Sequence, residues 1–235
     1  MIGLRDLTVS FEGFTLGPLT LDVGPGERVA LVGPNGAGTS TTRRSLAGRH
    51  TGYAGSARVL GLEVREEPAA ARARVGVLPE DALGFGWMTV AEHLRFLSAF
   101  FPTWDREYAT RLAARTGLPV GTRLANPSKG SRVKLSLVAA EAFRPEVLLL
   151  DEPTSGIDPV TRADILALID ECAPRGGGRT VLFSTHILED VEAVADRVVL
   201  LKDGRVLRDA PVHSLRQESP GMPLSTVLLR ELTGG

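Results

Sequence analysis

Short apolar runs alternate with stretches of helical periodicity along this chain. Residues 29–32 and 147–150 are wholly apolar, and residues 180–184 form a third, mostly apolar run. Uncharged runs of this length are typical of parallel strands that are buried on both faces. In residues 89–101, by contrast, the apolar positions fall on one face of a helix. The alternation predicts an α/β fold with a mostly parallel core sheet and helices on both of its faces.

Turn residues and caps predict the other elements. Gly17-Pro18 lies inside the second strand and indicates an edge strand or a bulge. Thr89 and Glu92 have the spacing of a capping box, and Asp203-Gly204 marks a hairpin. The predicted strands cover residues 4–9, 15–23, 28–32, 57–60, 75–80, 147–150, 180–184, 198–202 and 206–209. The predicted helices cover residues 41–47, 68–74, 89–101, 106–116, 132–143, 159–172, 188–195 and 224–232, with a polar loop at residues 127–131.

A single domain is expected to contain most of the chain. The sequence has no internal repeat, low-complexity run or evident linker. We expect residues 1–210 to form this domain, with a helical insert at about residues 81–144. Residues 211–235 are expected to be a C-terminal tail that is partly helical.

The first apolar strand leads into a glycine-rich loop whose spacing matches the phosphate-binding pattern G-x-x-x-x-G-K-[ST]. Glycines let such a loop turn sharply and direct its N–H groups at an anion, and the helix N-terminus behind it adds positive charge. Ser40 stands where a hydroxyl binds Mg²⁺, but the lysine position holds Thr39. The residues expected to bind nucleotide phosphates are Gly33, Pro34, Asn35, Gly36, Ala37, Gly38, Thr39, Ser40 and Thr41.

A second polar site follows the apolar run at residues 147–150. Asp151 and Glu152 stand at the carboxyl end of this strand, the edge at which α/β sheets bind ligands. We expect Asp151 to hold Mg²⁺ and Glu152 to act as the general base that polarises water. A solvated acidic strand end would explain the pair better if it stood alone, but the upstream loop favours phosphate chemistry.

The order of these motifs resembles the nucleotide-binding subunit of ABC transporters, from residue 4 to about residue 209. Residues 101–105 and Lys129 look most like the branch that serves ABC-2-type exporters, including the YtrB and EcsA kind. The resemblance implies a P-loop NTPase fold with an antiparallel β subdomain and a helical subdomain, and it implies ATP and Mg²⁺ as cofactors. It also implies two partners, a separate membrane permease and a second nucleotide-binding subunit, in a homodimer or a heterodimer.

The same resemblance assigns roles outside the two motifs. His186 matches the switch histidine beside the general base, and residues 155–158 resemble the D-loop. Phe11 or Phe14 would lie against adenine; we favour Phe11, although an ordinary sheet residue is an equal alternative there. A segment similar to the ABC signature, which contacts the γ-phosphate bound on the opposite subunit, contributes Ser128, Lys129 and Gly130. Ser128 could also simply cap a helix, which uses the same exposed N-terminus.

Three departures from the family pattern affect the expected chemistry. Glu80 replaces a glutamine that would bind Mg²⁺, and Pro127 and Ser131 alter the two ends of the signature. The largest departure is Thr39. A lysine charge about 3 Å from phosphate is worth roughly 5 kcal/mol at an effective dielectric of about 20, of which a hydroxyl returns about 1 kcal/mol. We therefore expect weaker nucleotide binding and still weaker hydrolysis.

Composition excludes several other classes of protein. The net charge of −1 gives no reason to expect nucleic acid as a partner. Cys172 is the only cysteine, which excludes a disulfide framework. No apolar run is long enough to cross a bilayer, and the first residues do not have the pattern of a signal peptide. We expect a cytoplasmic protein that is peripheral on the inner face of the plasma membrane.

Three functions are compatible with these observations. The favoured one is an ATP-binding subunit that couples MgATP binding and hydrolysis to transport by a separate permease. The second is a degenerate or regulatory subunit with little hydrolysis, paired with a competent partner. The third, a non-transport ABC ATPase, is disfavoured because such proteins usually have two cassettes or a long coiled-coil insert.

Overall fold

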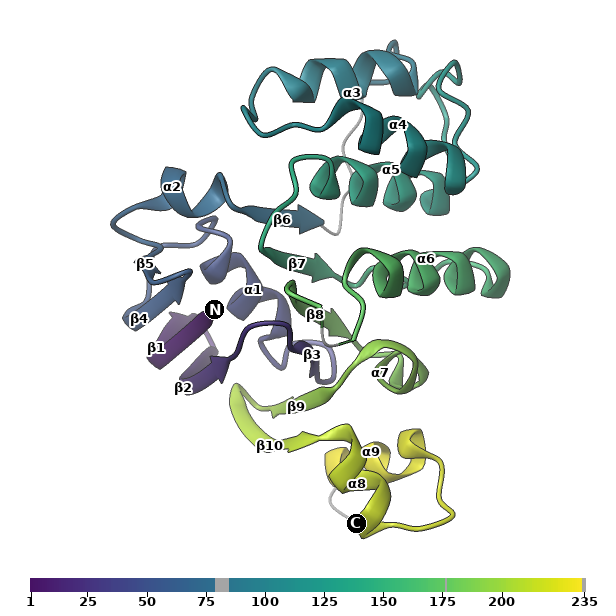
Figure 1. Cartoon of the computed structure of the whole chain (residues 1–235). Coiled ribbons are helices and arrows are strands. Elements are labelled where there is room, and N and C mark those ends of the chain that lie inside the picture. The colour runs from purple at the N-terminus through teal and green to yellow at the C-terminus, as the bar shows by residue number, and fades with distance from the viewer. Residues whose placement is uncertain (79–84, 176, 234–235) are drawn as a thin grey trace.

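A six-stranded sheet forms the centre of the molecule in the computed structural model, which describes residues 1–78, 85–175 and 177–233 (Figure 1). The strand order is β10-β9-β3-β8-β7-β6, and every neighbouring pair is parallel except β9 with β10. The predicted mostly parallel core sheet is therefore confirmed. Its strands are β3 (Arg28–Val32), β6 (Val75–Leu78), β7 (Val147–Asp151), β8 (Thr180–Thr185), β9 (Arg197–Lys202) and β10 (Arg205–Pro211).

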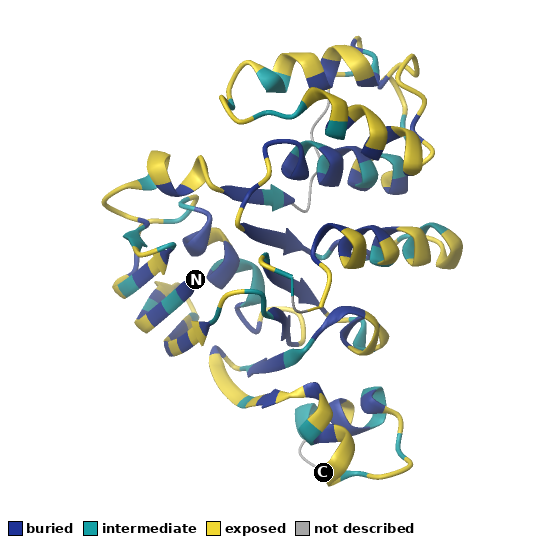
Figure 2. Ribbon diagram, viewed as in Figure 1, coloured by how far each residue is buried: buried dark blue, intermediate teal, exposed yellow. Residues whose placement is uncertain are grey.

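The central strands divide their side chains between two hydrophobic cores. In β3, Val29 and Leu31 join the core shared with a second sheet, whereas Ala30 and Val32 join the core shared with the helices. The strands β3, β7 and β8 are buried at every position and form the dark blue centre of Figure 2. Successive side chains of a strand point to opposite faces, and here both faces pack against a core, so the sequences of these strands are nearly continuous apolar runs. The prediction that these strands are buried on both faces is confirmed.

A smaller antiparallel sheet packs beside the first, with the strand order β2-β1-β4-β5. Its strands are β1 (Ile2–Phe11), β2 (Phe14–Val23), β4 (Ala54–Val59) and β5 (Leu62–Glu63). β2 lies at the edge, as Gly17-Pro18 predicted. Helix α1 (Thr39–Leu46) packs against β4 of this sheet and against β7 and β8 of the other. The helix that follows the glycine-rich loop is thus held between two sheets.

Three helices lie between β6 and β7, in the interval predicted to be a helical insert, and occupy the top of Figure 1. They are α3 (Val90–Ser98), α4 (Arg106–Arg115) and α5 (Lys129–Glu141). The predicted capping box of Thr89 and Glu92 is confirmed. The predicted start of α5 at residue 132 is wrong, because Ser128 accepts a hydrogen bond from Ser131 N at 3.1 Å and begins the helix three residues earlier.

The remaining helices are α2 (Pro68–Arg72), α6 (Pro159–Cys172), α7 (Leu188–Val194), α8 (Val212–Glu218) and α9 (Leu224–Thr233). Helix α2 packs against β5 and β6, and the other four contribute residues to the main core, which also contains residues of the helical insert. Helix α8 was not predicted, yet its Leu215 and Leu228 of α9 are fully buried in the main core. The division into residues 1–210 and a tail stays a prediction. Within the described part of the chain, every helix is too short or too polar to span a bilayer.

Candidate functional site

Glycines shape the loop between β3 and α1. The backbones of Gly36 and Gly38 are left-handed, with φ of 85° and 103°, which other residues rarely adopt. A Cβ on Gly38 would also collide with Leu16 of β2, and one on Gly33 would lie 2.6 Å from the backbone oxygen of Leu201 in β9. The absence of a side chain at these two glycines therefore lets the loop approach β2 and β9 closely. The loop ends at the N-terminus of α1, whose first turn has no acidic residue to compete for an anion.

This loop borders a cleft of about 790 Å³ in which four separate parts of the chain meet. They are the loop with the start of α1, the turn between β1 and β2, the segment after β7 and the segment after β8. A cleft of this size accommodates a nucleotide-sized ligand. Of the predicted residues, its lining contains Phe11, Gly33, Pro34, Asn35, Gly36, Gly38, Thr39, Ser40, Thr41, Glu152 and His186, together with Phe14, Arg44 and Ser155. Ala37 is buried within the loop instead.

Two aromatic rings border the cleft at the turn between β1 and β2. The rings of Phe11 and Phe14 are stacked, with centroids 6.4 Å apart. Phe11 is 47% exposed, whereas Phe14 is partly buried and packs against the smaller core. The more exposed ring is the one available to stack on a base. The adenine contact of Phe11 stays a prediction.

Glu152 and His186 lie side by side in the lining of the cleft. The Nδ1 atom of His186 lies 2.6 Å from Oε2 of Glu152. Glu152 has a left-handed backbone with φ of 45°, which costs of order 1–3 kcal/mol and is found mainly at functional sites. Its amide donates to Oγ of Ser184 at 3.1 Å, which helps to hold this conformation. The two residues predicted to be catalytic are thus adjacent and partly exposed, although their roles stay predictions.

Asp151 lies directly below the loop and is almost fully buried. Its Oδ1 accepts hydrogen bonds from Oγ of Ser40 at 3.1 Å and from Oγ of Ser184 at 2.7 Å. Its Oδ2 accepts a hydrogen bond from Nη2 of Arg43 and forms a salt bridge with it. The acidic residue at the end of β7 is therefore neutralised by a cation of the same chain.

Arg43 is the residue at this site that the sequence analysis did not single out. It is 2% exposed, and burial lowers the pKa of its guanidinium against the opposing pull of Asp151. Within the described structure, its Nε and Nη1 atoms are buried without a hydrogen-bond partner. The available signal was spacing. Arg43 stands four residues after Thr39, and helical side chains lean toward the N-terminus, so its guanidinium covers the turn that contains Thr39.

The described side chains at this point do not fit Mg²⁺ as the sequence predicted. Mg²⁺ requires oxygen ligands in near-octahedral geometry, and carboxylates are the ones that attract it. Both carboxylate oxygens of Asp151 already accept protein donors, one of them a guanidinium that would repel a metal cation. Glu80, the other predicted acidic ligand, lies outside the described residues. Within the described part of the chain, no three acidic, histidine or cysteine side chains are grouped to hold a metal.

The signature-like residues lie away from the cleft. Ser128 caps α5, and Lys129 and Gly130 form its first turn. The Nζ atom of Lys129 lies 3.2 Å from the position that a Cβ on Gly156 would occupy, so this end of α5 adjoins the segment at residues 155–158. None of Ser128, Lys129 and Gly130 lines the cleft. The structure therefore does not bring these signature-like residues and the glycine-rich loop together within one chain.

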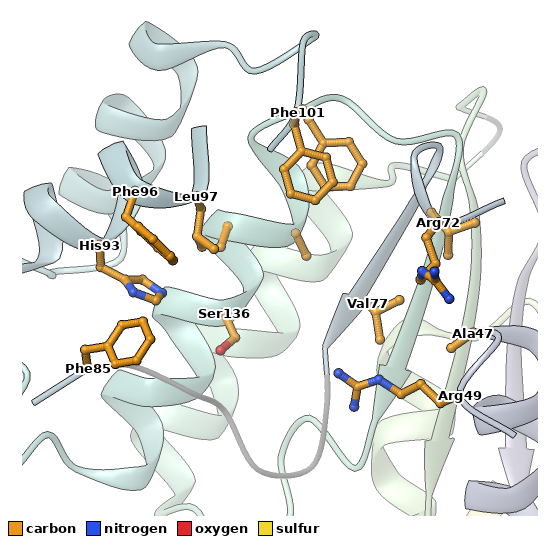
Figure 3. A pocket seen from close by; sticks show the side chains of 14 residues that line it. Ala47, Arg49, Arg72, Val77, Phe85, His93, Phe96, Leu97, Phe101 and Ser136 are labelled. Atoms are coloured by element: carbon orange, nitrogen blue, oxygen red, sulfur yellow. The ribbon is translucent and has the colours of Figure 1, made fainter. Parts of the chain in front are cut away.

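A second, apolar cavity of about 570 Å³ separates the helical insert from the sheet (Figure 3). Figure 3 shows His93, Phe96 and Leu97 of α3 on one side and Arg49, Arg72 and Val77 on the other. Beside it, the ring of Phe85 contacts those of Trp87 and Phe96, and the ring of Phe96 contacts that of Phe100. These four side chains are 40–68% exposed. An exposed aromatic patch of this kind is typical of an interaction surface.

Comparison with known proteins identifies the family. The ABC transporter family model matches residues 16–155. The chain is 34% identical over 230 residues to the Nod factor export ATP-binding protein I of Rhizobium leguminosarum bv. viciae, covering 95% of this chain and 73% of that protein. It is also 34% identical over 205 residues to the ABC transporter ATP-binding protein YxlF of Bacillus subtilis, covering 85% of this chain and 67% of that protein.

Solved structures agree with this assignment. A structure described as the ATP-binding subunit of an ABC transporter superposes with a TM-score of 0.86 at 28% identity, covering 98% of this chain and 99% of the other. A bacterial ABC transporter cassette, solved as a dimer, has the same fold with a TM-score of 0.80 at 22% identity, covering 90% of this chain and 98% of the other. The glycine-rich loop, the acidic strand end and these likenesses together lead to one conclusion: the chain belongs to the ABC transporter family, as an ATP-binding subunit.

Proposed function

We propose that this subunit binds ATP at a subunit interface and couples it to transport by a separate permease in the membrane. The observation that carries the proposal is the cleft, which places the glycine loop opposite Glu152 and His186. The N–H groups at the start of α1 would bind the phosphates, and Phe11 would stack on the base. ATP is the nucleotide expected from the family.

Hydrolysis in this subunit is proposed to be slow. Glu152 would take a proton from the attacking water, and His186 would hold its carboxylate in position through the 2.6 Å contact. Thr39 supplies no charge to stabilise the transition state, which removes the electrostatic contribution of a lysine. The loss of that charge and the engagement of Asp151 by Arg43 favour the second function, a degenerate or regulatory subunit beside a competent partner.

A second nucleotide-binding subunit is proposed to complete the site. The signature-like residues of this chain lie away from its own cleft, so they are available to a cleft on another subunit. The partner could be a second copy or a different chain. The dimeric cassette with the same fold supports a paired arrangement.

The membrane partner is proposed to bind over the exposed aromatic patch of Phe85, Trp87, Phe96 and Phe100. Burial of this patch would remove apolar surface from water, the main favourable term in protein association. This arrangement would place the subunit peripherally on the cytoplasmic face of the membrane. We do not expect nucleic acid to bind, since the net charge is −1.

Binding of a fluorescent ATP analogue and release of phosphate test the proposal, with Glu152→Gln as the variant. The wild-type chain should bind the analogue and release phosphate slowly. Glu152→Gln should keep the affinity and lose most of the release, since a general base contributes about 10²–10⁴-fold. Absence of binding by the wild-type chain would contradict nucleotide binding. Equal release by both proteins would exclude Glu152 as the base.

A further inference from the structure

The nucleotide loop lacks its lysine, yet a cation lies one helical turn behind it. Residues four apart share a helix face, so Arg43 occupies the face of Thr39 and leans back toward the loop. The two positions together carry the single positive charge that a lysine at position 39 would supply. The positive charge therefore lies at a buried position behind the loop and not on the surface of the loop.

Arg43 is placed at the carboxylate from which a metal would be held. Its Nη2 binds Oδ2 of Asp151, while the hydroxyls of Ser40 and Ser184 donate to Oδ1. Among the described residues, one cation and two hydroxyls therefore engage both carboxylate oxygens of Asp151. A negative phosphate group entering the cleft would meet a neutral ion pair below the loop, where an unpaired carboxylate would repel it.

A purely structural role explains Arg43 poorly. A buried arginine that serves only stability normally has acceptors for its donors, because each unsatisfied donor costs desolvation energy. Within the described residues, Nε and Nη1 of Arg43 have no acceptor although the side chain is 98% buried. If a metal ion balanced the charge of Asp151 instead, an apolar side chain at position 43 would avoid that cost.

We propose that Arg43 is a built-in cation that takes the place of Mg²⁺ at Asp151, so that this subunit binds ATP without requiring the metal. The inference rests on the nucleotide binding proposed above and adds how the site balances charge. It assigns Arg43 as a charge-compensating residue below the phosphate loop. Ser40 then serves Asp151 as a hydrogen-bond donor.

The test measures affinity for a fluorescent ATP analogue in excess MgCl₂ and in excess EDTA. The wild-type affinity should differ by less than about threefold between the two conditions. Arg43→Gln keeps a polar side chain but removes the charge, and it should bind poorly in EDTA and gain about tenfold or more on adding Mg²⁺. Arg43→Lys should restore the metal-independent binding of the wild type. Thr39→Lys/Arg43→Gln should bind tightly only with Mg²⁺.

Arg28→Gln is the matched control, because Arg28 is an equally buried arginine outside the cleft. It should lower stability without changing the ratio of affinities in Mg²⁺ and EDTA. Circular dichroism of each variant shows whether it has folded, and if Arg43→Gln has not, Thr39→Lys/Arg43→Lys provides the comparison, with metal-independent binding expected.

The possible failures are distinguishable. Equal dependence on Mg²⁺ in the wild type and in Thr39→Lys/Arg43→Gln would overturn the role of Arg43 while leaving nucleotide binding intact. Binding by that double variant but not by the wild type would also overturn it, since Arg43 would then block the site. Absence of binding in every protein would overturn the proposed function and, with it, this inference.

Discussion

Two buried arginines lie near opposite ends of β3, and their surroundings differ. Arg28 begins the strand, and each of its three side-chain nitrogen atoms donates a hydrogen bond, to Asp170, Asp196 or the backbone oxygen of Ala173. Arg43 lies in the helix after the strand and is buried to the same degree, but within the described residues only its Nη2 has an acceptor. Every side-chain nitrogen atom of Arg28 thus has an acceptor, whereas two of the three in Arg43 have none among the described residues.

The two arginines also differ in how deeply their acidic partners are buried. The acidic partners of Arg28 are partly exposed, so their charges keep contact with water. Asp151 is buried, and its pair with Arg43 lies below a cleft whose lining residues are predicted to bind phosphate. A buried pair contributes little net stability unless every donor is satisfied. The pair at the amino end is therefore interpreted as structural and the pair at the carboxyl end as functional.

The largest expected effect on stability is that of Arg28→Leu. The substitution removes four hydrogen bonds to charged or backbone acceptors, and we expect a loss of about 3 kcal/mol in the free energy of unfolding. Urea unfolding followed by circular dichroism measures it. The affinity of the folded fraction for an ATP analogue should not change. An unchanged unfolding midpoint would contradict a structural role for Arg28.

Arg43→Leu should cost less, about 2 kcal/mol, because leaving a buried charge unpaired costs about 3–5 kcal/mol and removing unsatisfied donors returns about 1–3 kcal/mol. The loss of the cation leaves Asp151 with only its two serine donors, but it also removes two unsatisfied nitrogen atoms. The double variant Arg43→Leu/Asp151→Asn should be more stable than Arg43→Leu alone, because no buried charge remains unpaired. A loss equal to or larger than that of Arg28→Leu in the same urea assay would remove the contrast between the two arginines.

The sequence was sufficient for the buried central strands and the glycine-rich loop, because both depend on local chemistry; β5 and the exact bounds of β4 were not predicted. Apolar runs define buried strands, and the glycines at positions 36 and 38 have the left-handed backbone that lets the loop turn sharply. The partner of Arg43 was not predictable in the same way. Helical spacing gives the face on which Arg43 lies, but Asp151 is 108 residues away in the chain and comes under that face only through the pairing of β7 with β8 and β8 with β3.

The smallest expected effect concerns His93, which tests whether an unsatisfied buried group always indicates function. Among the residues that the structure describes, its Nδ1 is also buried without a partner, but the side chain lines the apolar cavity between the helical insert and the sheet, away from the cleft (Figure 3). Burial lowers the pKa of His93 below its ordinary value of 6.5. Arg49 and Arg72 line the same cavity, whose described lining has no acidic side chain, so no group there offsets a charge on the imidazole.

A histidine whose pKa is lowered by folding binds more protons in the unfolded chain. Its contribution to stability is therefore fully present above pH 6.5 and is lost as the pH falls through 6.5 toward the lowered value. His93→Leu should flatten the fall in unfolding free energy between about pH 7 and pH 5 and leave ATP affinity unchanged. Leu97→Ala, in the same cavity, should lower stability equally at both pH values. A change in ATP affinity in His93→Leu would contradict this prediction, because it would mean that His93 also contributes to nucleotide binding.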